Sequence, residues 1–321
     1  MASKERYRNV DLKPELKSFR DEVIAGLSEK QKRISPKFFY DEEGSKLFNA
    51  ITRLEEYYPT RTEASILSAH KEEICNLFSD HGALFEYGSG GSFKTEILLD
   101  SCKRIDTYVP IDISSFYLEQ SSKKLLVKYP SLKIISIALD YSGDFTIPML
   151  DLSGNIVAIF LGSSLGNFEP EVSKTFMWNA MENLDEKDRL LVGVDLVKDK
   201  DVLERAYNDK SGVTAAFNLN LLKRIRRELR SDINPEDFEH YAFYNDEMNR
   251  IEMHLRAKKD IHFSVDQVKI TMKKGETIHT ENSYKYSVDQ FTELARQNHL
   301  EIKHMWCDAK NYFAIFVLKK I

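Results

Sequence analysis

The chain has 321 residues, of which 42% are hydrophobic and 30% are charged. This length suits one large or two ordinary domains. A net charge of −5 disfavours a general role in binding nucleic acid or a membrane surface. The best apolar run, residues 156–161, is far too short to span a membrane and indicates a strand.

The chain contains only three cysteines, Cys75, Cys102 and Cys307. Because their number is odd and their spacing matches no zinc site, we expect reduced thiols and no metal centre. Residues 1–6 lack the apolar stretch of a secretion signal. Together these features predict a cytoplasmic protein.

The first part of the chain reads as helical. Apolar residues recur every three or four positions over residues 16–27 and again over 47–54, as one face of a helix requires. Pro36 separates the two stretches. Thr60 and Glu63 have the spacing of a capping box, so we expect a third helix to start at Thr60.

From residue 84 onward, apolar strand patterns alternate with amphipathic helical patterns. The predicted strands are 84–87, 105–111, 133–139, 155–161 and 189–194. Strands separated by helices favour parallel pairing with right-handed crossovers. After a helical stretch at 201–230, residues 240–283 read as β-rich, which indicates a second domain. A helix at 287–298 and strands at 299–306 and 312–319 predict a terminal antiparallel hairpin.

The most informative stretch is 84–94, a buried strand followed by a glycine turn and a helix start. Glu86 lies near the end of the strand, and Gly88 and Gly90 follow at a spacing of two. Phe93 stands where a dinucleotide-binding turn would have its third glycine. The pattern resembles the cofactor turn of S-adenosylmethionine-dependent methyltransferases, and the alternative is an ordinary glycine-rich turn.

Polar residues follow the next strands. Asp112 ends the second strand about twenty residues past the glycines, where an acid suits ribose hydroxyls; the alternative is a helix N-cap. Asp140 and Tyr141 close the third strand, where an adenine edge is usually contacted. Asn167, in the loop after the fourth strand, offers an acceptor and donors to a ligand, or is simply a turn-favoured residue.

A basic cluster lies near the end of the 201–230 helical stretch, with members Lys223, Arg224, Arg226, Arg227 and Arg230. Acidic residues flank it and no aromatic stacking pattern accompanies it. We therefore interpret it as a solvated helix face rather than a nucleic-acid site.

Beyond these generic features, the chain resembles the L-histidine Nα-methyltransferases, which make hercynine in ergothioneine biosynthesis, from about residue 35 to the C-terminus. The stretches that carry the resemblance are 38–41, 51–54, 56–63, 161–167, 195–199, 212–218 and 250–253. The resemblance implies an α/β fold: a Rossmann-like class I S-adenosylmethionine-dependent methyltransferase domain over 62–197 and 286–321. A second α+β domain, over 1–61 and 198–285, would bind the substrate.

The resemblance also implies the site. The cofactor S-adenosylmethionine would contact Tyr40, Gly88, Ser89, Gly90, Lys94, Asp112, Asp140 and Tyr141. The amino acid would contact Tyr57, Gly162, Ser164, Asn167, Tyr207, Met253, Glu281 and Ser283. The catalytic groups would be Tyr40, Tyr57 and Gly162, which would tolerate the product cation through ring faces and loop carbonyls.

The implied reaction is three methyl transfers to the α-amino nitrogen of L-histidine, a small-molecule substrate, by a monomer without nucleic-acid or membrane partners. Ser164, His254 and Asn282 depart from the residues expected in relatives. The alternatives are another amino acid, such as tryptophan, and a non-enzymatic cofactor-binding protein. Glu281 discriminates between the amino acids, because an indole has little use for a facing carboxylate, unless Glu281 is merely a solvated strand residue.

Overall fold

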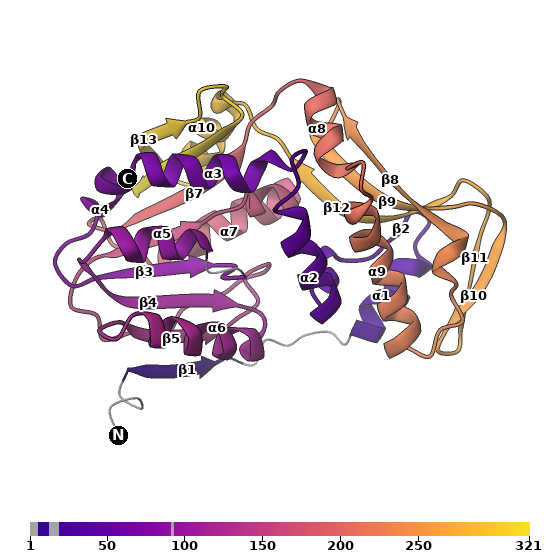
Figure 1. The fold of residues 1–321 in the computed structure, drawn as a ribbon, viewed down its shortest axis with the longest axis horizontal. Helices are drawn as coiled ribbons and strands as arrows, with labels where there is room; N and C mark the ends of the chain where they lie inside the picture. The colour runs from indigo at the N-terminus through magenta and orange to yellow at the C-terminus, as the bar shows by residue number, and fades with distance from the viewer. Residues whose placement is uncertain (1–5, 13–18, 91–92) are drawn as a thin grey trace. The chain divides into compact units, whose positions relative to one another are not determined.

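A computed structural model describes residues 6–12, 19–90 and 93–321 of the chain (Figure 1). It divides into two compact units. The first comprises Met1–Glu15, Pro59–Val197 and Tyr286–Ile321, and the second comprises Leu16–Tyr58 and Lys198–Lys285. Leu16, part of the first predicted helix, lies outside the described residues.

The first unit is built on an eight-stranded sheet of order β1-β5-β4-β3-β6-β7-β14-β13. Its strands are β1 (Tyr7–Asp11), β3 (Gly82–Tyr87), β4 (Ile105–Asp112), β5 (Lys133–Ala138), β6 (Ile156–Phe160), β7 (Arg189–Asp195), β13 (Leu300–Cys307) and β14 (Phe313–Lys320). Neighbouring strands pair in parallel along the series β1-β5-β4-β3-β6-β7. Strand β14 is antiparallel to both β7 and β13. Strand order reverses beside β3, which is where doubly wound sheets bind ligands.

Helices cover both faces of this sheet. They are α3 (Tyr58–Ala69), α4 (Lys71–Cys75), α5 (Phe93–Ser101), α6 (Ser115–Lys128), α7 (Pro170–Glu182) and α10 (Val288–Gln297). One apolar cluster joins the sheet to α3, α4, α5 and α6, and a second joins it to α7 and α10. Within β3, Leu84 belongs to the first cluster and Phe85 to the second, so this strand is buried on both faces, as in other parallel sheets.

Strand β1 corrects the expected division of the chain, which placed residues 1–61 in the substrate domain. It pairs in parallel with β5, from Tyr7 opposite Ile134 to Asp11 opposite Ala138, and so extends the sheet of the first unit. Its alternation is weak because it is a partly exposed edge strand, with Tyr7 and Val10 as its apolar residues. Such a strand carries little of the hydrophobic pattern that marks the inner ones.

The cysteine prediction is also corrected. Cys75 and Cys102 form a disulfide across 27 residues of sequence, whereas reduced thiols were expected. Cys75 ends α4 and Cys102 directly follows α5, and the packing of these two helices brings the sulfurs together. Linear spacing alone could not reveal this contact. Cys307 keeps a free thiol.

The second unit contains a four-stranded sheet of order β2-β12-β9-β8 and a separate hairpin. The sheet strands are β2 (Lys32–Arg33), β8 (Phe238–Asn245), β9 (Arg250–Ala257) and β12 (Thr277–Tyr284), and the hairpin pairs β10 (Ile261–Val265) with β11 (Val268–Met272). Its helices are α1 (Phe19–Ser28), α2 (Glu42–Ile51), α8 (Lys200–Tyr207) and α9 (Val213–Glu228), with short turns η1 (Pro36–Phe39) and η3 (Pro235–Asp237). Within the described residues, none of the helices combines the length and apolar content that a membrane crossing requires.

Candidate active site

The glycine turn follows β3 directly. Gly88 has φ of +71°, which strains any residue with a Cβ, and a Cβ there would lie 2.8 Å from the Tyr141 hydroxyl, so glycine is favoured at this position. Its N–H donates to the carbonyl of Ile111 at 2.8 Å, which fixes the turn against the end of β4. At Gly90 a Cβ would meet no described atom within 4 Å, which leaves room for a ligand to approach the backbone.

Glu86, the acidic residue of the glycine-turn motif, is buried. Glu86 accepts a hydrogen bond from the Thr95 hydroxyl at 2.6 Å and another from the Tyr108 hydroxyl. Burial raises the pKa of this carboxyl, and the two hydroxyls oppose the shift. Glu86 thereby ties β3 to α5 and β4, and it holds the glycine turn in place.

Asp112 lies at the end of β4, beside the glycine turn. Its carboxylate is half-buried and accepts a hydrogen bond from the Ser114 N–H at 3.1 Å; burial raises its pKa. The N-cap of α6 is Ser114, whose hydroxyl accepts from the Tyr117 N–H at 3.4 Å. The helix-cap interpretation of Asp112 is therefore wrong.

Asp140 and Tyr141 follow β5, the next strand of the sheet, at the same edge. Asp140 accepts from the N–H and the hydroxyl of Ser142, at 2.9 and 2.6 Å. The Tyr141 ring packs edge-on against Phe160, with centroids 5.9 Å apart. The carboxyl ends of β3, β4 and β5 thus carry Gly88, Asp112 and Asp140 side by side.

The loop after β6 is held by an acid that sequence analysis assigned to another role. Glu63, fully buried on α3, accepts from the Gly162 N–H at 2.8 and 2.9 Å and from the Lys94 ammonium at 2.6 Å. A Cβ at Gly193, on β7, would lie 1.9 Å from a Glu63 carboxylate oxygen. The capping-box prediction is wrong, because α3 already begins at Tyr58.

A signal for this role was present in the sequence. Glu63 stands three and four residues before Ile66 and Leu67, which places it on the apolar face of its helix. An acid on a buried face needs a partner, since an unpaired buried charge is very costly.

The rest of this loop bends sharply into a short 3₁₀ turn, η2 (Ser164–Asn167). Gly162 and Ser163 both have positive φ, +81° and +55°. The Ser164 hydroxyl donates to the carbonyl of Leu161 at 2.9 Å. The Asn167 amide is half-buried at the end of the turn and has no hydrogen-bond partner within the described part of the chain.

The second unit gathers the residues predicted to read the side chain of the substrate. On β12, Glu281 lies opposite Met253 of β9, and Ser283 lies opposite Ile251. Residues directly opposite each other share a face of the sheet. Glu281, Ser283 and Met253 therefore lie on one face, and all three are buried.

A lysine that sequence analysis missed completes this group. Lys285 is 2% exposed and donates to the Ser283 hydroxyl at 2.6 Å, and the Tyr207 hydroxyl donates to the same oxygen at 2.8 Å. Burial raises the pKa of Glu281 to about 7, and the charge of Lys285 opposes the rise. The signal in the sequence was the spacing of two between Ser283 and Lys285, because side chains two residues apart in an extended segment point to the same face.

The predicted tyrosines also lie together. Tyr40 packs edge-on against Phe48 at 5.6 Å between centroids, Phe48 packs against Tyr57 at 6.4 Å, and Tyr57 packs against Tyr207 at 6.2 Å. All belong to the second unit, whereas the other predicted cofactor residues and Gly162, Ser164 and Asn167 belong to the first. Each unit thus carries its own group of site residues.

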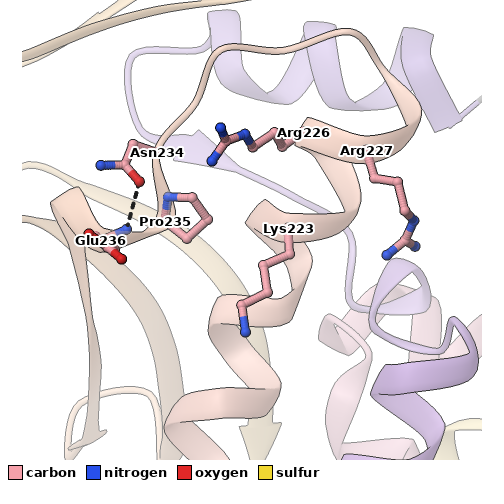
Figure 2. A pocket seen from close by; sticks show the side chains of 6 residues that line it. All are labelled: Lys223, Arg226, Arg227, Asn234, Pro235 and Glu236. Atoms are coloured by element: carbon pink, nitrogen blue, oxygen red, sulfur yellow. Dashed lines mark hydrogen bonds between the residues drawn. The ribbon is translucent and has the colours of Figure 1, made fainter.

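The second unit also has a basic hollow of about 530 Å³ between α9 and η3 (Figure 2), and its lining residues are Lys223, Arg226, Arg227, Asn234, Pro235 and Glu236. None of the predicted site residues lines it. The Arg227 guanidinium donates to Asp41 at 2.7 Å, while Lys223 and Arg226 are exposed. These contacts fit a solvated helix face.

The sheet order, the glycine turn after β3 and the antiparallel β14 define a class I S-adenosylmethionine-dependent methyltransferase. The chain belongs to the family of S-adenosylmethionine-dependent, histidine-specific methyltransferases, whose sequence profile matches residues 19–320.

Individual relatives agree. The histidine N-alpha-methyltransferase of Mycolicibacterium smegmatis is 38% identical over 304 residues, which cover 93% of this chain and 94% of the relative. The protein of the same name from Mycobacterium tuberculosis is 36% identical over 310 residues, 94% and 95% of the two chains. An L-tryptophan methyltransferase of Psilocybe serbica is 28% identical over 313 residues, 87% and 86% of the two chains.

The residues of the first unit fit S-adenosylmethionine. The backbone at Gly90 is open to a ligand, and Asp112 presents a half-buried carboxylate beside it. A carboxylate in this position suits two ribose hydroxyls, which are donors.

Replacing Asp112 by alanine should weaken cofactor binding at least about tenfold, because two charge-assisted hydrogen bonds of about 1.5–3 kcal/mol each would be lost. Isothermal titration calorimetry measures the change. Asp106→Ala, on the same strand, removes a partly exposed acid paired with His81 and is the matched control. Unchanged affinity in a folded Asp112 variant would reject the assignment.

Proposed function

We propose that the chain transfers three methyl groups from S-adenosylmethionine to the α-amino nitrogen of L-histidine, giving hercynine for ergothioneine biosynthesis. The observation that carries the proposal is the buried group formed by Glu281 and Ser283 on β12 and Lys285 directly after it, with Tyr207 hydrogen-bonded to Ser283. In this group Glu281 can accept a hydrogen bond and Ser283 can donate one. They therefore complement the N–H and the lone pair of a neutral imidazole.

The direction of each hydrogen bond follows from the contacts. The Ser283 oxygen already accepts from Lys285 and Tyr207, so its own O–H is left to donate. A neutral imidazole has one N–H and one nitrogen lone pair. The Glu281 carboxylate would accept from the N–H, and Ser283 would donate to the lone pair, while Met253 fills the apolar volume beside Glu281.

The chain itself has to position the amine. S-adenosylmethionine supplies an already activated methyl group, so the protein needs to hold a neutral amine in line with it. A free α-amino group titrates near about 8, so part of the substrate is neutral at physiological pH. Asn167, whose amide is half-buried in the first unit, would bind the α-carboxylate. The Gly162 carbonyl would stabilise the cation that each transfer leaves.

The assignment of the second unit as the substrate-binding part rests on these contacts. A monomer with a cytoplasmic location stays a prediction. The cytoplasmic expectation rested on reduced thiols, and the disulfide of Cys75 with Cys102 removes that support.

The test is to incubate the full chain with S-adenosylmethionine and each of the twenty amino acids and to follow product masses. We expect histidine to gain one, two and three methyl groups and the other amino acids to remain unchanged. Histamine, which lacks the carboxylate, should be a poor substrate. Methylation of tryptophan in preference to histidine, or cofactor binding without turnover of any amino acid, would contradict the proposal.

A further inference from the structure

The second sheet also carries a cluster of metal-ligating side chains, on the face opposite Glu281 and Met253. Glu252 and His254 alternate with Met253 along β9, and His279 lies opposite His254 on β12. One ligand atom from each of Glu252, His254 and His279 lies within 4.8 Å of the other two. Glu252 and His254 are buried and His279 is half-buried.

A β-bulge creates this cluster. The register of β12 passes from His279 opposite His254 to Glu281 opposite Met253, so Thr280 is an extra residue on its strand. Strict alternation would place His279 and Glu281 on the same face. The bulge instead moves His279 to the face of His254, with the two imidazole centroids 4.9 Å apart.

We propose that Glu252, His254 and His279 bind Zn²⁺ or a similar divalent transition metal ion. Two imidazoles and one carboxylate are a ligand set that zinc accepts, with a fourth position left for water. Tetrahedral ligands at about 2.0–2.1 Å from zinc lie about 3.3 Å from each other. The Glu252 Oε2 and His254 Nε2 atoms are already 3.0 Å apart, and a ligand atom of His279 lies within 4.8 Å of the other two, so side-chain rotation has to close only the remaining gap.

The surrounding contacts orient the three ligands. Glu252 Oε1 accepts from Arg250 and Asn245, both at 2.9 Å, and so Oε2 is the atom turned toward His254. His254 Nδ1 lies 3.1 Å from the Thr277 hydroxyl, which fixes the plane of the imidazole. Outer contacts of this kind set the ring orientation of ligating histidines.

The histidine tautomers allow an ion to enter. The Thr277 hydroxyl can donate or accept, so an N–H on His254 Nδ1 leaves the Nε2 lone pair for the ion. His279 Nε2 lies 2.9 Å from the Asn282 amide oxygen, which only accepts, so the N–H of His279 is on Nε2 and Nδ1 is the nitrogen that would bind the ion. Ion binding at His254 then moves the single proton of the neutral ring from Nε2, where it faces Glu252 Oε2, to Nδ1, where the Thr277 hydroxyl accepts it, so no proton is released.

The test uses the full chain after treatment with a chelator. Zn²⁺ is titrated against a chromogenic chelator, and Co²⁺ serves as a spectroscopic probe of tetrahedral ligation. We expect one equivalent of Zn²⁺ per chain. His254→Gln and His279→Gln should weaken the affinity at least about a hundredfold, and Thr277→Val, an outer contact, about tenfold.

The matched control is His262→Gln. His262 forms the same type of hydrogen bond, to Thr271 at 3.0 Å in the β10–β11 hairpin, but it is not in the cluster. Its loss should leave Zn²⁺ binding unchanged. Thermal unfolding by circular dichroism checks that each variant folds. If His254→Gln does not fold, Glu252→Gln provides a second variant of a ligand.

Two results would overturn the proposal. One is a wild-type chain that takes up no Zn²⁺ at micromolar concentration, which would make the cluster a closed hydrogen-bond network around Arg250. The other is equal binding by wild type, His254→Gln and His279→Gln, which would place the ion on surface histidines. Neither result depends on methyltransferase activity, so the proposed function stands or falls separately.

Discussion

Replacing Glu281 by alanine should reduce the preference of the enzyme for histidine over tryptophan by about 3 kcal/mol or more, because an imidazole N–H would face a desolvated pocket without an acceptor. The variant also removes a buried acid and enlarges the pocket, so tryptophan should gain in relative terms. The measurement is the ratio of kcat/KM for the two amino acids in wild type and variant.

The control for this experiment is Glu239→Ala, which removes an exposed glutamate of the same sheet, paired with Arg256 at 2.8 Å. It should leave the ratio unchanged. A ratio that moves by less than about threefold in Glu281→Ala, below about 1 kcal/mol, would mean that Glu281 does not read the side chain.

The same residue predicts a pH dependence. Because burial raises the pKa of Glu281 to about 7, its carboxyl is protonated below that pH, and its uncharged oxygen is then a weaker acceptor for the imidazole N–H. The value of kcat/KM reports groups of the free enzyme and free substrate. Below pH 7, kcat/KM should therefore fall more steeply with decreasing pH in the wild type than in Glu281→Gln. The difference in slope should be about one power of ten per pH unit. Parallel profiles would contradict this role.

Replacing Glu63 by glutamine should be the most damaging change in the first unit. The carboxylate is fully buried and is the partner of the Lys94 ammonium and of the Gly162 N–H. Removing one member of a buried ion pair costs about 3–5 kcal/mol, because the other charge is left uncompensated. We expect the free energy of unfolding to fall by about this amount and kcat to fall with it, since the Gly162 loop loses its anchor.

Chemical denaturation and steady-state kinetics measure these two effects. Glu96→Gln is the matched control, because Glu96 pairs with Lys128 at 2.7 Å on the exposed surface of the same unit. Exposed pairs contribute little, so this variant should resemble wild type in both measurements. Wild-type stability in Glu63→Gln would contradict the structural role given to the buried carboxylate.

Much of the fold could be predicted from the sequence where burial imposes a pattern. The inner strands β3 to β7 fall within two residues of their predicted limits, because parallel strands covered on both faces are nearly continuous apolar runs. The edge strand β1 escaped prediction because it is partly exposed and mostly polar.

The site could be predicted only as far as local periodicity holds. Alternation along β12 puts Glu281 and Ser283 on one face, but it does not hold for His279, because the bulge at Thr280 shifts the register. The partners of Glu63 lie 31 and 99 residues away in the sequence. Contacts of that range, like the Cys75–Cys102 pair, leave no spacing signal in a single sequence.

The absent side chain at Gly193 links two distant positions of the chain. A methyl group there would occupy the place of the Glu63 carboxylate, at 1.9 Å from its oxygen. The two positions therefore cannot vary independently: any residue larger than glycine at 193 displaces the Glu63 carboxylate or requires a shorter side chain at 63, and either change releases the loop after β6. A strand in the middle of the sheet thus restricts which sequences are compatible with methyl transfer, although Gly193 itself need not touch a ligand.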